Sequence, residues 1–385
     1  MSADPIRTVA VLGAGIMGHG IAQVTVMSGY TVHLYDIKQA YLDRGINAMD
    51  ESLGRLLAKG KISNDQYLQI KSDLLKPFLN LEAAVQGADL VIEAIPEVME
   101  LKRNMFTEVD NICPPHTILA TNTSTIRPSQ IATATQRPDR FLGMHYFTPV
   151  VFMPLIEIIR ADQTSEETMG IALDFALKTE RVPLRIEKDT PGFIANRVLQ
   201  FPKSVLLGCI LDQDIVKPEA LDDQWRTLTG SALGPFEIMD FAGLDTYINA
   251  SNYLSRELHP DYTPCRVIQE KVNAGQLGRK SGRGIYDYSD GKPKIGLSET
   301  ETAITAHDVM AVMINEATKI IEEGLCTAED VDKTAIYGMR DKEGPMTYAK
   351  RLKPAELAQR LDELADMCDK EIFRPTEYIR MGAYL

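Results

Sequence analysis

The sequence predicts an α/β fold for its first half, in which helices flank a doubly wound parallel sheet, and an all-helical fold for its second half. Three observations lead to this expectation. Short apolar runs rich in β-branched residues alternate with longer amphipathic stretches up to about residue 188, a glycine-rich turn follows the first run, and such runs stop after residue 189. Apolar runs of this length are typical of buried parallel strands, and their alternation with helices is typical of βαβ units.

The elements of the first half can be placed along the chain. We expect strands at Thr8–Leu12, Thr31–Tyr35, Ala88–Ile95, Thr117–Thr121, Phe141–Met144 and Leu155–Ile159. We expect helices at Ile16–Met27, Tyr41–Lys59 and Glu97–Asn111. After residue 189 the pattern turns helical, and Ser289–Thr300 is expected to be a linker because it is polar and contains Gly and Pro.

The turn after the first strand reads Gly13-Ala14-Gly15-Ile16-Met17-Gly18, a GxGxxG pattern that opens a helix. Gly13 permits the tight turn, Gly15 lets the backbone approach a pyrophosphate, and Gly18 lets helix and strand pack closely. The N-terminus of the helix then faces the phosphates. We therefore expect a Rossmann-type domain in which this turn, including Ile16 and Met17, binds a dinucleotide.

The second expected strand ends in Asp36, 18 positions after Gly18. A carboxylate about 20 residues after the glycines accepts hydrogen bonds from the ribose hydroxyls of the adenosine. The same carboxylate would repel the 2′-phosphate of NADP, and in the sequence only Lys38 stands close enough to counter it. The sequence therefore predicts NAD as the cofactor.

Composition and charge exclude several classes of protein. Hydrophobic residues make up 44% and charged residues 25% of the chain, as in soluble globular proteins, and no apolar run approaches the ~18 residues of a membrane span. The first residues lack a secretory signal, so we expect a cytoplasmic protein. A net charge of −13 argues against nucleic acid as a partner, and five scattered cysteines without a CxxC pair are expected to be reduced and to bind no metal.

Seven segments carry a more specific pattern. They are VAVLGAGIMGHGIAQV (9–24), VIEAIPEVMELKRNMF (91–106), ATNTSTI (120–126), GMHYFTPVVFMPLIEII (143–159), DTPGFIANRVL (189–199), GPFEIMDFAGLDT (234–246) and GRKSGRGIYDY (278–288). Together they resemble the 3-hydroxyacyl-CoA dehydrogenase family, which includes 3-hydroxybutyryl-CoA dehydrogenases, over about the first 290 residues. The resemblance implies an NAD-binding sheet domain, a helical domain, and reversible oxidation of a short-chain (S)-3-hydroxyacyl-CoA to the 3-oxoacyl-CoA.

The resemblance assigns a catalytic pair to His145, in GMHYF, and Glu157, in LIEII. Hydride leaves C3 of the substrate only as the hydroxyl proton departs, so a base is needed at that oxygen. Imidazole suits this role because its ordinary pKa lies near neutrality. A buried carboxylate would fix the ring tautomer and stabilise the imidazolium that forms.

The resemblance also assigns roles to residues in four other segments. Ser124 would contact substrate and nicotinamide, and Asn196 would help to place the reacting carbonyl region. Glu97 and Lys102 would line the nicotinamide-ribose end of the cofactor. Lys280 would reach the cofactor from the helical domain.

One position departs from the family pattern, and the substrate end of the site is less well defined. The family commonly has HFFNP where this chain has HYFTP, so Thr148 replaces an asparagine and brings a hydroxyl but no amide to the cofactor. We expect altered cofactor contacts or substrate preference from this change. Ser52 and Lys59 stand where the family has a serine and a lysine that meet CoA, although a solvated helix end explains the lysine equally well.

The last part of the chain repeats the helical domain. Ile215–Asp222 matches Leu325–Asp332, and Gly234-Pro235 matches Gly344-Pro345, both at an offset of 110 residues. We therefore expect three domains, over residues 1–188, 189–290 and 300–385. The last domain should have no catalytic role and should act as a built-in dimer partner, so that the chain forms a pseudo-dimer, which allows it to be a monomer. The alternative is an appended domain that packs elsewhere, with ordinary dimerisation retained. Its apolar contact positions should include Val309, Val312, Met313 and Ile320.

Two alternatives to this function remain. A dehydrogenase of the same fold can act on a small alcohol without CoA, such as L-gulonate or carnitine, although HYFTPV is closer to the acyl-CoA group. A non-catalytic NAD-binding protein would keep the glycines and lose His145 or Glu157, and both are present.

Overall fold

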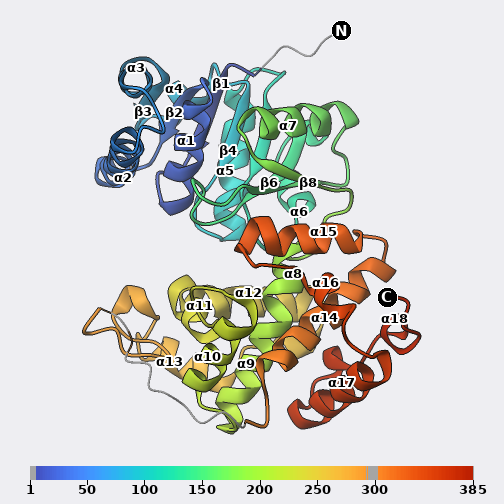
Figure 1. The fold of residues 1–385 in the computed structure, drawn as a ribbon. Helices are drawn as coiled ribbons and strands as arrows, with labels where there is room; N and C mark the ends of the chain where they lie inside the picture. The colour runs from blue at the N-terminus through green and yellow to red at the C-terminus, as the bar shows by residue number, and fades with distance from the viewer. Residues whose placement is uncertain (1–5, 292, 294–301, 385) are drawn as a thin grey trace. The chain divides into compact units, whose positions relative to one another are not determined.

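The computed structural model describes residues 6–291, 293 and 302–384, and it divides into two compact units, residues 1–190 and 191–385 (Figure 1). The linker expected over residues 289–300 lies largely outside the described residues. The first unit contains the sheet and the second is helical, which confirms the α/β and all-helical expectation.

The first unit is built on an eight-stranded sheet in the order β3-β2-β1-β4-β5-β6-β7-β8. The strands are β1 Thr8–Leu12, β2 Thr31–Tyr35, β3 Leu75–Phe78, β4 Leu90–Glu93, β5 Ile118–Thr121, β6 Phe141–Tyr146, β7 Leu155–Arg160 and β8 Val182–Ile186. Only the β6–β7 pair is antiparallel. Strand order reverses between β1 and β4, which is where open α/β sheets bind their ligands.

All six expected strands are present, and the two strands at the edges of the sheet are additional. β3 contains Lys76 and Pro77, and β8 contains Pro183 and Arg185. Charged residues and proline are tolerated in edge strands because one side of such a strand makes no ladder hydrogen bonds. The same residues hide these strands from a search for apolar runs. β4, β5 and β6, in contrast, are buried along their whole length.

The sheet is flanked by helices, which enclose its apolar core. They are α1 Ile16–Met27, α2 Gln39–Ala58, α3 Asn64–Gln69, α4 Leu81–Val85, α5 Met99–Ile112, α6 Pro128–Ala132 and α7 Glu166–Lys178. The three helices expected from the sequence are present. The third begins at Met99 rather than at Glu97, because the chain is still extended at Val98.

The second unit is formed by helices α8 to α18. They are α8 Ala195–Leu199, α9 Phe201–Gln213, α10 Pro218–Thr229, α11 Pro235–Ala242, α12 Leu244–Glu257, α13 Arg266–Asn273, α14 Ala306–Glu322, α15 Ala328–Lys333, α16 Pro345–Ala349, α17 Pro354–Cys368 and α18 Glu377–Arg380. Three helices of the first part have counterparts that begin 110 residues later: α10 corresponds to α15, α11 to α16, and α12 to α17.

A side-chain cap repeats at the same offset. Asp222 accepts a hydrogen bond from the backbone N–H of Phe236 (2.8 Å), in the first turn of α11. Asp332 accepts one from the N–H of Met346 (2.8 Å), in the first turn of α16. Both carboxylates satisfy a helix N–H that has no partner within its own helix. The second part of the helical unit therefore repeats the first in its local interactions as well as in its order of helices.

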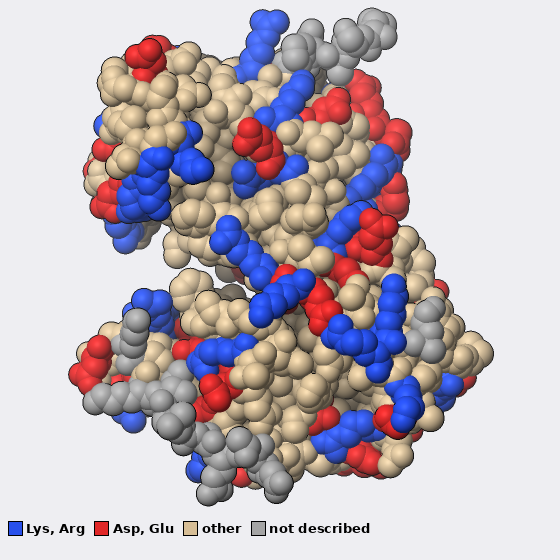
Figure 2. All heavy atoms as spheres, in the orientation of Figure 1, with Lys and Arg blue, Asp and Glu red and all other residues tan. Residues whose placement is uncertain are grey.

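Charged side chains of both signs mix over the face of the protein drawn in Figure 2. The five cysteines all lie within the described residues, and none of them forms a disulfide there. The described residues contain no group of three or more His, Cys, Asp or Glu arranged to hold a metal ion. Within the same residues, no helix combines the length and the apolar character needed to cross a bilayer.

Candidate active site

His145 and Glu157 lie opposite each other on neighbouring strands. β6 and β7 are antiparallel, and their register pairs His145 directly with Glu157, which explains how residues 12 positions apart meet. The imidazole Nδ1 is 2.7 Å from Glu157 Oε2, and the carboxylate side chain is fully buried. When Nδ1–H donates to the carboxylate, Nε2 carries the lone pair that can accept a proton. This is the pairing that the sequence predicted.

Neighbouring groups hold this end of β6 in place. The side-chain Oδ1 of Asn122, just beyond β5, accepts the backbone N–H of Tyr146 at 2.9 Å. The ring of Phe147 lies 4.6 Å from the imidazole of His145, measured between centroids. Sequence reasoning missed Asn122, although an amide directly after a buried strand was a signal that could have drawn attention to it.

Lys102 is the centre of a buried ionic cluster. Its Nζ lies 2.7 Å from Glu93 Oε1 and 3.1 Å from Glu97 Oε2, and its side chain is only 1% exposed. Burial by itself would lower the pKa of Lys102, but the charges of Glu93 and Glu97 raise it. Burial would raise the pKa of Glu97, but Lys102 and the hydrogen bonds to the carboxylate lower it. The expected Glu97–Lys102 pair is therefore present, and Glu93 is a third member that the sequence did not reveal.

The directions of these two pKa shifts determine the pH range over which the cluster contributes to stability. The lowered pKa of Glu97 means that its contribution to stability is lost only as the pH falls through that lowered value. The raised pKa of Lys102 means that its contribution is lost only as the pH rises through that raised value. The ion pair therefore stabilises the sheet unit across the neutral range.

Glu97 also orders the loop after β5. Its Oε1 accepts the hydroxyl of Thr123 and the backbone N–H groups of Ser124 (3.1 Å) and Thr125 (3.3 Å). The position of Ser124 is thus set by Glu97, which Lys102 holds in turn. Ser124 is not the N-cap of the following helix α6, because Arg127 occupies that position.

Replacing Lys102 with methionine is expected to destabilise the sheet unit by about 3–5 kcal/mol, because Glu93, whose side chain is fully buried, would be left without its counter-charge. The free energy of unfolding can be measured by urea titration followed by circular dichroism. Arg103→Met on the same helix is the matched control, because Arg103 is exposed and should change stability by less than about 0.5 kcal/mol. Equal stability of the two variants would contradict the role given to the cluster.

The glycine-rich turn has the shape of a phosphate-binding loop. Gly13 has φ +103°, and a Cβ on Gly18 would lie 1.7 Å from the carbonyl oxygen of Gly13, so neither position accepts a side chain. Around Gly15 no atom lies within 4 Å of a would-be Cβ, and this residue precedes α1, whose first turn has no acidic residue. Open space at a helix N-terminus fits a bound pyrophosphate. Asp36 Oδ2 accepts the N–H of Ala14 (2.8 Å), which fixes the carboxylate beside the turn with a second oxygen for a ribose hydroxyl.

Thr148 connects the strand of His145 to the glycine-rich turn. Its hydroxyl donates to the sulfur of Met17 at 2.7 Å, and the Thr148–Pro149 peptide bond is cis. Ile16, the neighbour of Met17, is 72% exposed at the start of α1. The residue that departs from the family pattern therefore contacts the turn expected to bind the dinucleotide.

Four expected site residues remain to be placed, two in each compact unit. Ser52 Oγ accepts the amide of Gln23 (3.0 Å), and Lys59 is exposed at the end of α2. Asn196, on α8, and Lys280, whose Nζ lies 2.6 Å from Asp245 Oδ1, belong to the helical unit. Their assigned contacts with cofactor and substrate stay predictions.

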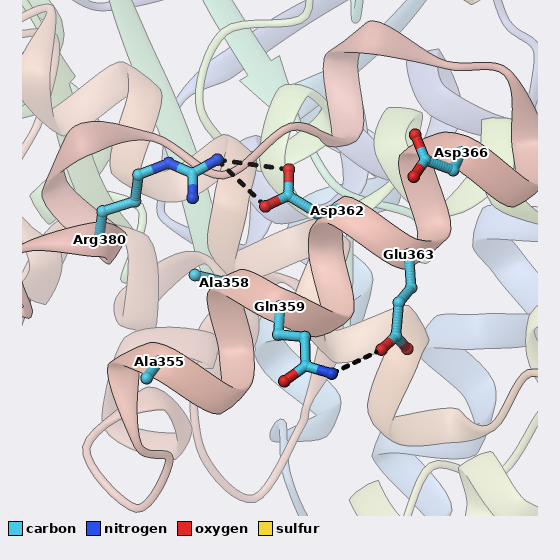
Figure 3. Close-up of a pocket in the computed structure, with 7 residues that line it drawn as sticks. All are labelled: Ala355, Ala358, Gln359, Asp362, Glu363, Asp366 and Arg380. Atoms are coloured by element: carbon cyan, nitrogen blue, oxygen red, sulfur yellow. Dashed lines mark hydrogen bonds and ion pairs between the residues drawn. The ribbon is translucent and has the colours of Figure 1, made fainter.

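A surface cavity of about 610 Å³ lies on the helical unit along α17 (Figure 3). Its walls include the ion pair between Arg380 and Asp362 (3.2 Å) and the hydrogen bond between Gln359 and Glu363 (3.0 Å). It contains none of the residues expected in the active site. We therefore place the chemistry at the His145–Glu157 pair on β6 and β7 rather than in this cavity.

A glycine-rich βα turn, a carboxylate after β2 and a buried His–Glu pair at the same end of the sheet define a dinucleotide-dependent oxidoreductase. Two family models match the chain: "3-hydroxyacyl-CoA dehydrogenase, NAD binding domain" over residues 8–190, and "3-hydroxyacyl-CoA dehydrogenase, C-terminal domain" over residues 192–288. The chain belongs to the 3-hydroxyacyl-CoA dehydrogenase family.

Individual relatives agree with this assignment. The chain is 40% identical to a probable 3-hydroxybutyryl-CoA dehydrogenase of Bacillus subtilis over 74% of its own length and 98% of the relative. It is 35% identical to the mitochondrial hydroxyacyl-coenzyme A dehydrogenase of Mus musculus over 74% of its length and 91% of the relative. The crystal structure of 3-hydroxybutyryl-CoA dehydrogenase from Escherichia coli K12 matches 98% of both chains, with a TM-score of 0.85 and 26% identity.

Proposed function

We propose that the protein is an NAD-dependent (S)-3-hydroxyacyl-CoA dehydrogenase that oxidises short-chain substrates such as 3-hydroxybutyryl-CoA, reversibly. The observation that carries the proposal is the buried His145–Glu157 pair on β6 and β7. Membership of the family and the names of the relatives support the substrate class. Formation of NADH when (S)-3-hydroxybutyryl-CoA is added tests the proposal, and a stable protein that forms no NADH with any acyl chain length would refute it.

The fit of the first unit to NAD rests on its own residues. The turn Gly13–Gly18 leaves room for the pyrophosphate at the N-terminus of α1. Asp36 lies beside this turn, where its carboxylate can accept hydrogen bonds from the adenosine ribose. Bound NAD supplies the acceptor for the hydride that leaves C3 of the substrate. Glu97 and Lys102 line the nicotinamide-ribose end through the loop that they order.

Residues of the protein itself remove the proton of the 3-hydroxyl group. His145 Nε2 removes the proton of the 3-hydroxyl as the hydride leaves C3, so the alcohol becomes a ketone and the imidazole becomes an imidazolium. Glu157 accepts the Nδ1–H and stabilises the positive charge in a site that water reaches poorly. The family resemblance assigns the orientation of the substrate oxygen to Ser124 and Asn196.

Replacing Asp36 with alanine is expected to narrow the preference for NAD over NADP, most visibly through KM. The carboxylate accepts ribose hydroxyls and repels a 2′-phosphate, and alanine does neither. Steady-state rates with both cofactors measure the change, with Asp43→Ala, an exposed carboxylate on α2, as the control. Wild-type protein that uses NADP as efficiently as NAD would contradict the assignment.

A further part of the proposal is that the chain is organised into domains 1–188, 189–290 and 300–385, and that it is a pseudo-dimer and a monomer in solution. α14 of the second helical copy packs against α8, α9 and α10 of the first. The four apolar positions expected at this contact, Val309, Val312, Met313 and Ile320, are at most 2% exposed. A second copy on the same chain is present at high effective concentration, so it occupies this face in preference to another molecule.

A further inference from the structure

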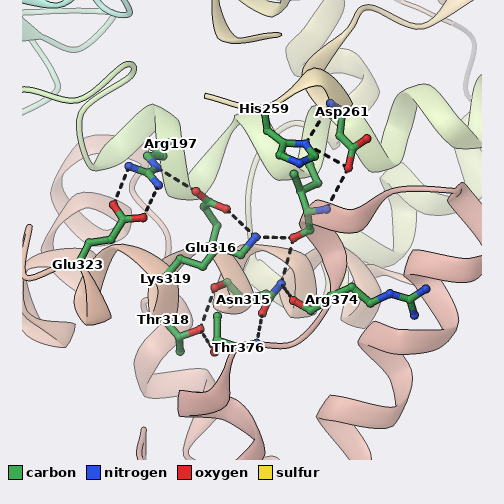
Figure 4. Close-up of polar contacts among 11 residues, drawn as sticks. Arg197, His259, Asp261, Asn315, Glu316, Thr318, Lys319, Glu323, Arg374 and Thr376 are labelled. Atoms are coloured by element: carbon green, nitrogen blue, oxygen red, sulfur yellow. Dashed lines mark hydrogen bonds and ion pairs between the residues drawn. The ribbon is translucent and has the colours of Figure 1, made fainter. Parts of the chain in front are cut away.

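Arg197 connects the two helical copies at the residue next to Asn196. It lies on the short helix α8, is only 7% exposed, and donates from Nε to Glu316 Oε1 at 2.9 Å. Its Nη1 and Nη2 donate to the two oxygens of Glu323 at 3.2 and 3.1 Å. Both glutamates belong to the second copy, at α14 and its C-terminal cap (Figure 4).

The carboxylates of Glu316 and Glu323 favour the charged form of the Arg197 guanidinium. Burial by itself would lower the pKa of Arg197, but Glu316 and Glu323 raise it. A guanidinium presents its donors in a rigid planar fork, so two carboxylates bound to it fix its orientation as well as its position. Truncating either partner would leave a buried charge incompletely paired.

The carboxylates are themselves held in place. Lys319 donates to Glu316 Oε2 (3.4 Å) and to the carbonyl of Ile372 (2.5 Å). The N–H of Ile372 donates to Asp261 Oδ2 of the first copy at 3.0 Å. Figure 4 shows this path running from Arg197 through α14 and back to the first copy. α14 is therefore a fixed support for α8 rather than a loosely packed neighbour.

The first copy cannot provide these carboxylates from its own equivalent helix. At the offset of 110 residues, the positions of Glu316 and Glu323 correspond to Leu206 and Gln213 on α9. Leu206 is fully buried and neither residue carries a charge. The ionic support of Arg197 thus comes from the second copy.

We propose that the second helical copy is part of the catalytic apparatus, because Glu316 and Glu323 hold Arg197 and thereby set the position of the adjacent Asn196. Arg197, Glu316 and Glu323 are positioning residues in this account. The inference revises the expectation that residues 300–385 have no part in catalysis, and it rests on the proposed function through the role given to Asn196. Small displacements of a group that orients substrate can lower turnover roughly 100-fold without loss of the fold.

A double-mutant cycle with Asn196 tests this role. The double variant Glu316→Gln/Glu323→Gln is expected to lower kcat for 3-hydroxybutyryl-CoA oxidation by roughly 10- to 100-fold while the Kd for NAD stays at its wild-type value. In an Asn196→Ala background the same two substitutions should cause little further loss, because the residue that they position is already gone. Glu322→Gln, on the same helix but without an observed contact to Arg197, should have wild-type kcat.

Each outcome has a distinct meaning. Losses that multiply in the Asn196→Ala background would overturn the inference, since they would show a general structural effect. If the double variant unfolds, Glu323→Gln alone serves in the same cycle, because the Glu323 side chain is 49% exposed and its loss disturbs packing less. Full activity of Asn196→Ala would also overturn the inference, because it would remove the role given to Asn196, whereas no activity of the wild type would remove the proposed function.

Discussion

Replacing His145 with glutamine is expected to lower turnover by roughly 10²- to 10⁴-fold while NAD affinity stays near its wild-type value. Glutamine is close to histidine in size but cannot accept the hydroxyl proton, and His145 lies on β6 rather than in the glycine-rich turn. Single-turnover rates isolate hydride transfer from product release.

The control for this variant is His116→Gln. His116 is 56% exposed and its Nε2 lies 3.1 Å from Asp89, just before β5. We expect wild-type turnover from this control. A folded His145→Gln protein with near-wild-type turnover would remove the histidine from the mechanism.

Deleting residues 302–385 is expected to change the association state of the protein. The truncation would expose the apolar surfaces of α8, α9 and α10 that α14 covers. Large uncovered apolar patches are rare on soluble monomers, so the truncated chain should dimerise or aggregate through this face. Sedimentation or light scattering of both chains measures the difference, and we expect the full chain to be monomeric.

The truncation also separates two accounts of the second copy. If it only covers an apolar face, a truncated dimer should regain activity when a second molecule takes its place. If Glu316 and Glu323 are needed to position Arg197, that dimer should stay impaired, because α9 offers Leu206 and Gln213 instead. A truncated chain that stays soluble and monomeric would contradict the pseudo-dimer proposal itself.

Local patterns made much of the fold predictable. The six inner strands, the turn Gly13–Gly18 and the carboxylate Asp36 follow one another within short stretches of sequence, so their order can be recognised without tertiary information. The edge strands β3 and β8 could not be recognised in this way. Their prolines and charged residues are tolerated because, among the described residues, no further strand pairs with their outer sides, and this depends on the order of strands in the complete sheet.

The site residues, too, separate into those that the sequence revealed and those that it did not. The resemblance to a family placed His145 and Glu157, and the register of β6 and β7 explains why they meet. Glu93 and Asn122 were missed because their roles depend on neighbours distant in sequence: Glu93 meets Lys102, and Asn122 meets the backbone of β6. The support of Arg197 by a repeated domain was hidden for the same reason.

The central claim is tested most directly by initial rates of NADH formation with (S)-3-hydroxybutyryl-CoA and with free 3-hydroxybutyrate, measured on the same preparation. The account predicts rapid oxidation of the thioester with NAD, slow oxidation with NADP, and little oxidation of the free acid, because binding of the CoA portion contributes to kcat/KM. Oxidation of the free acid at an equal or greater rate, or failure to oxidise the thioester, would contradict it.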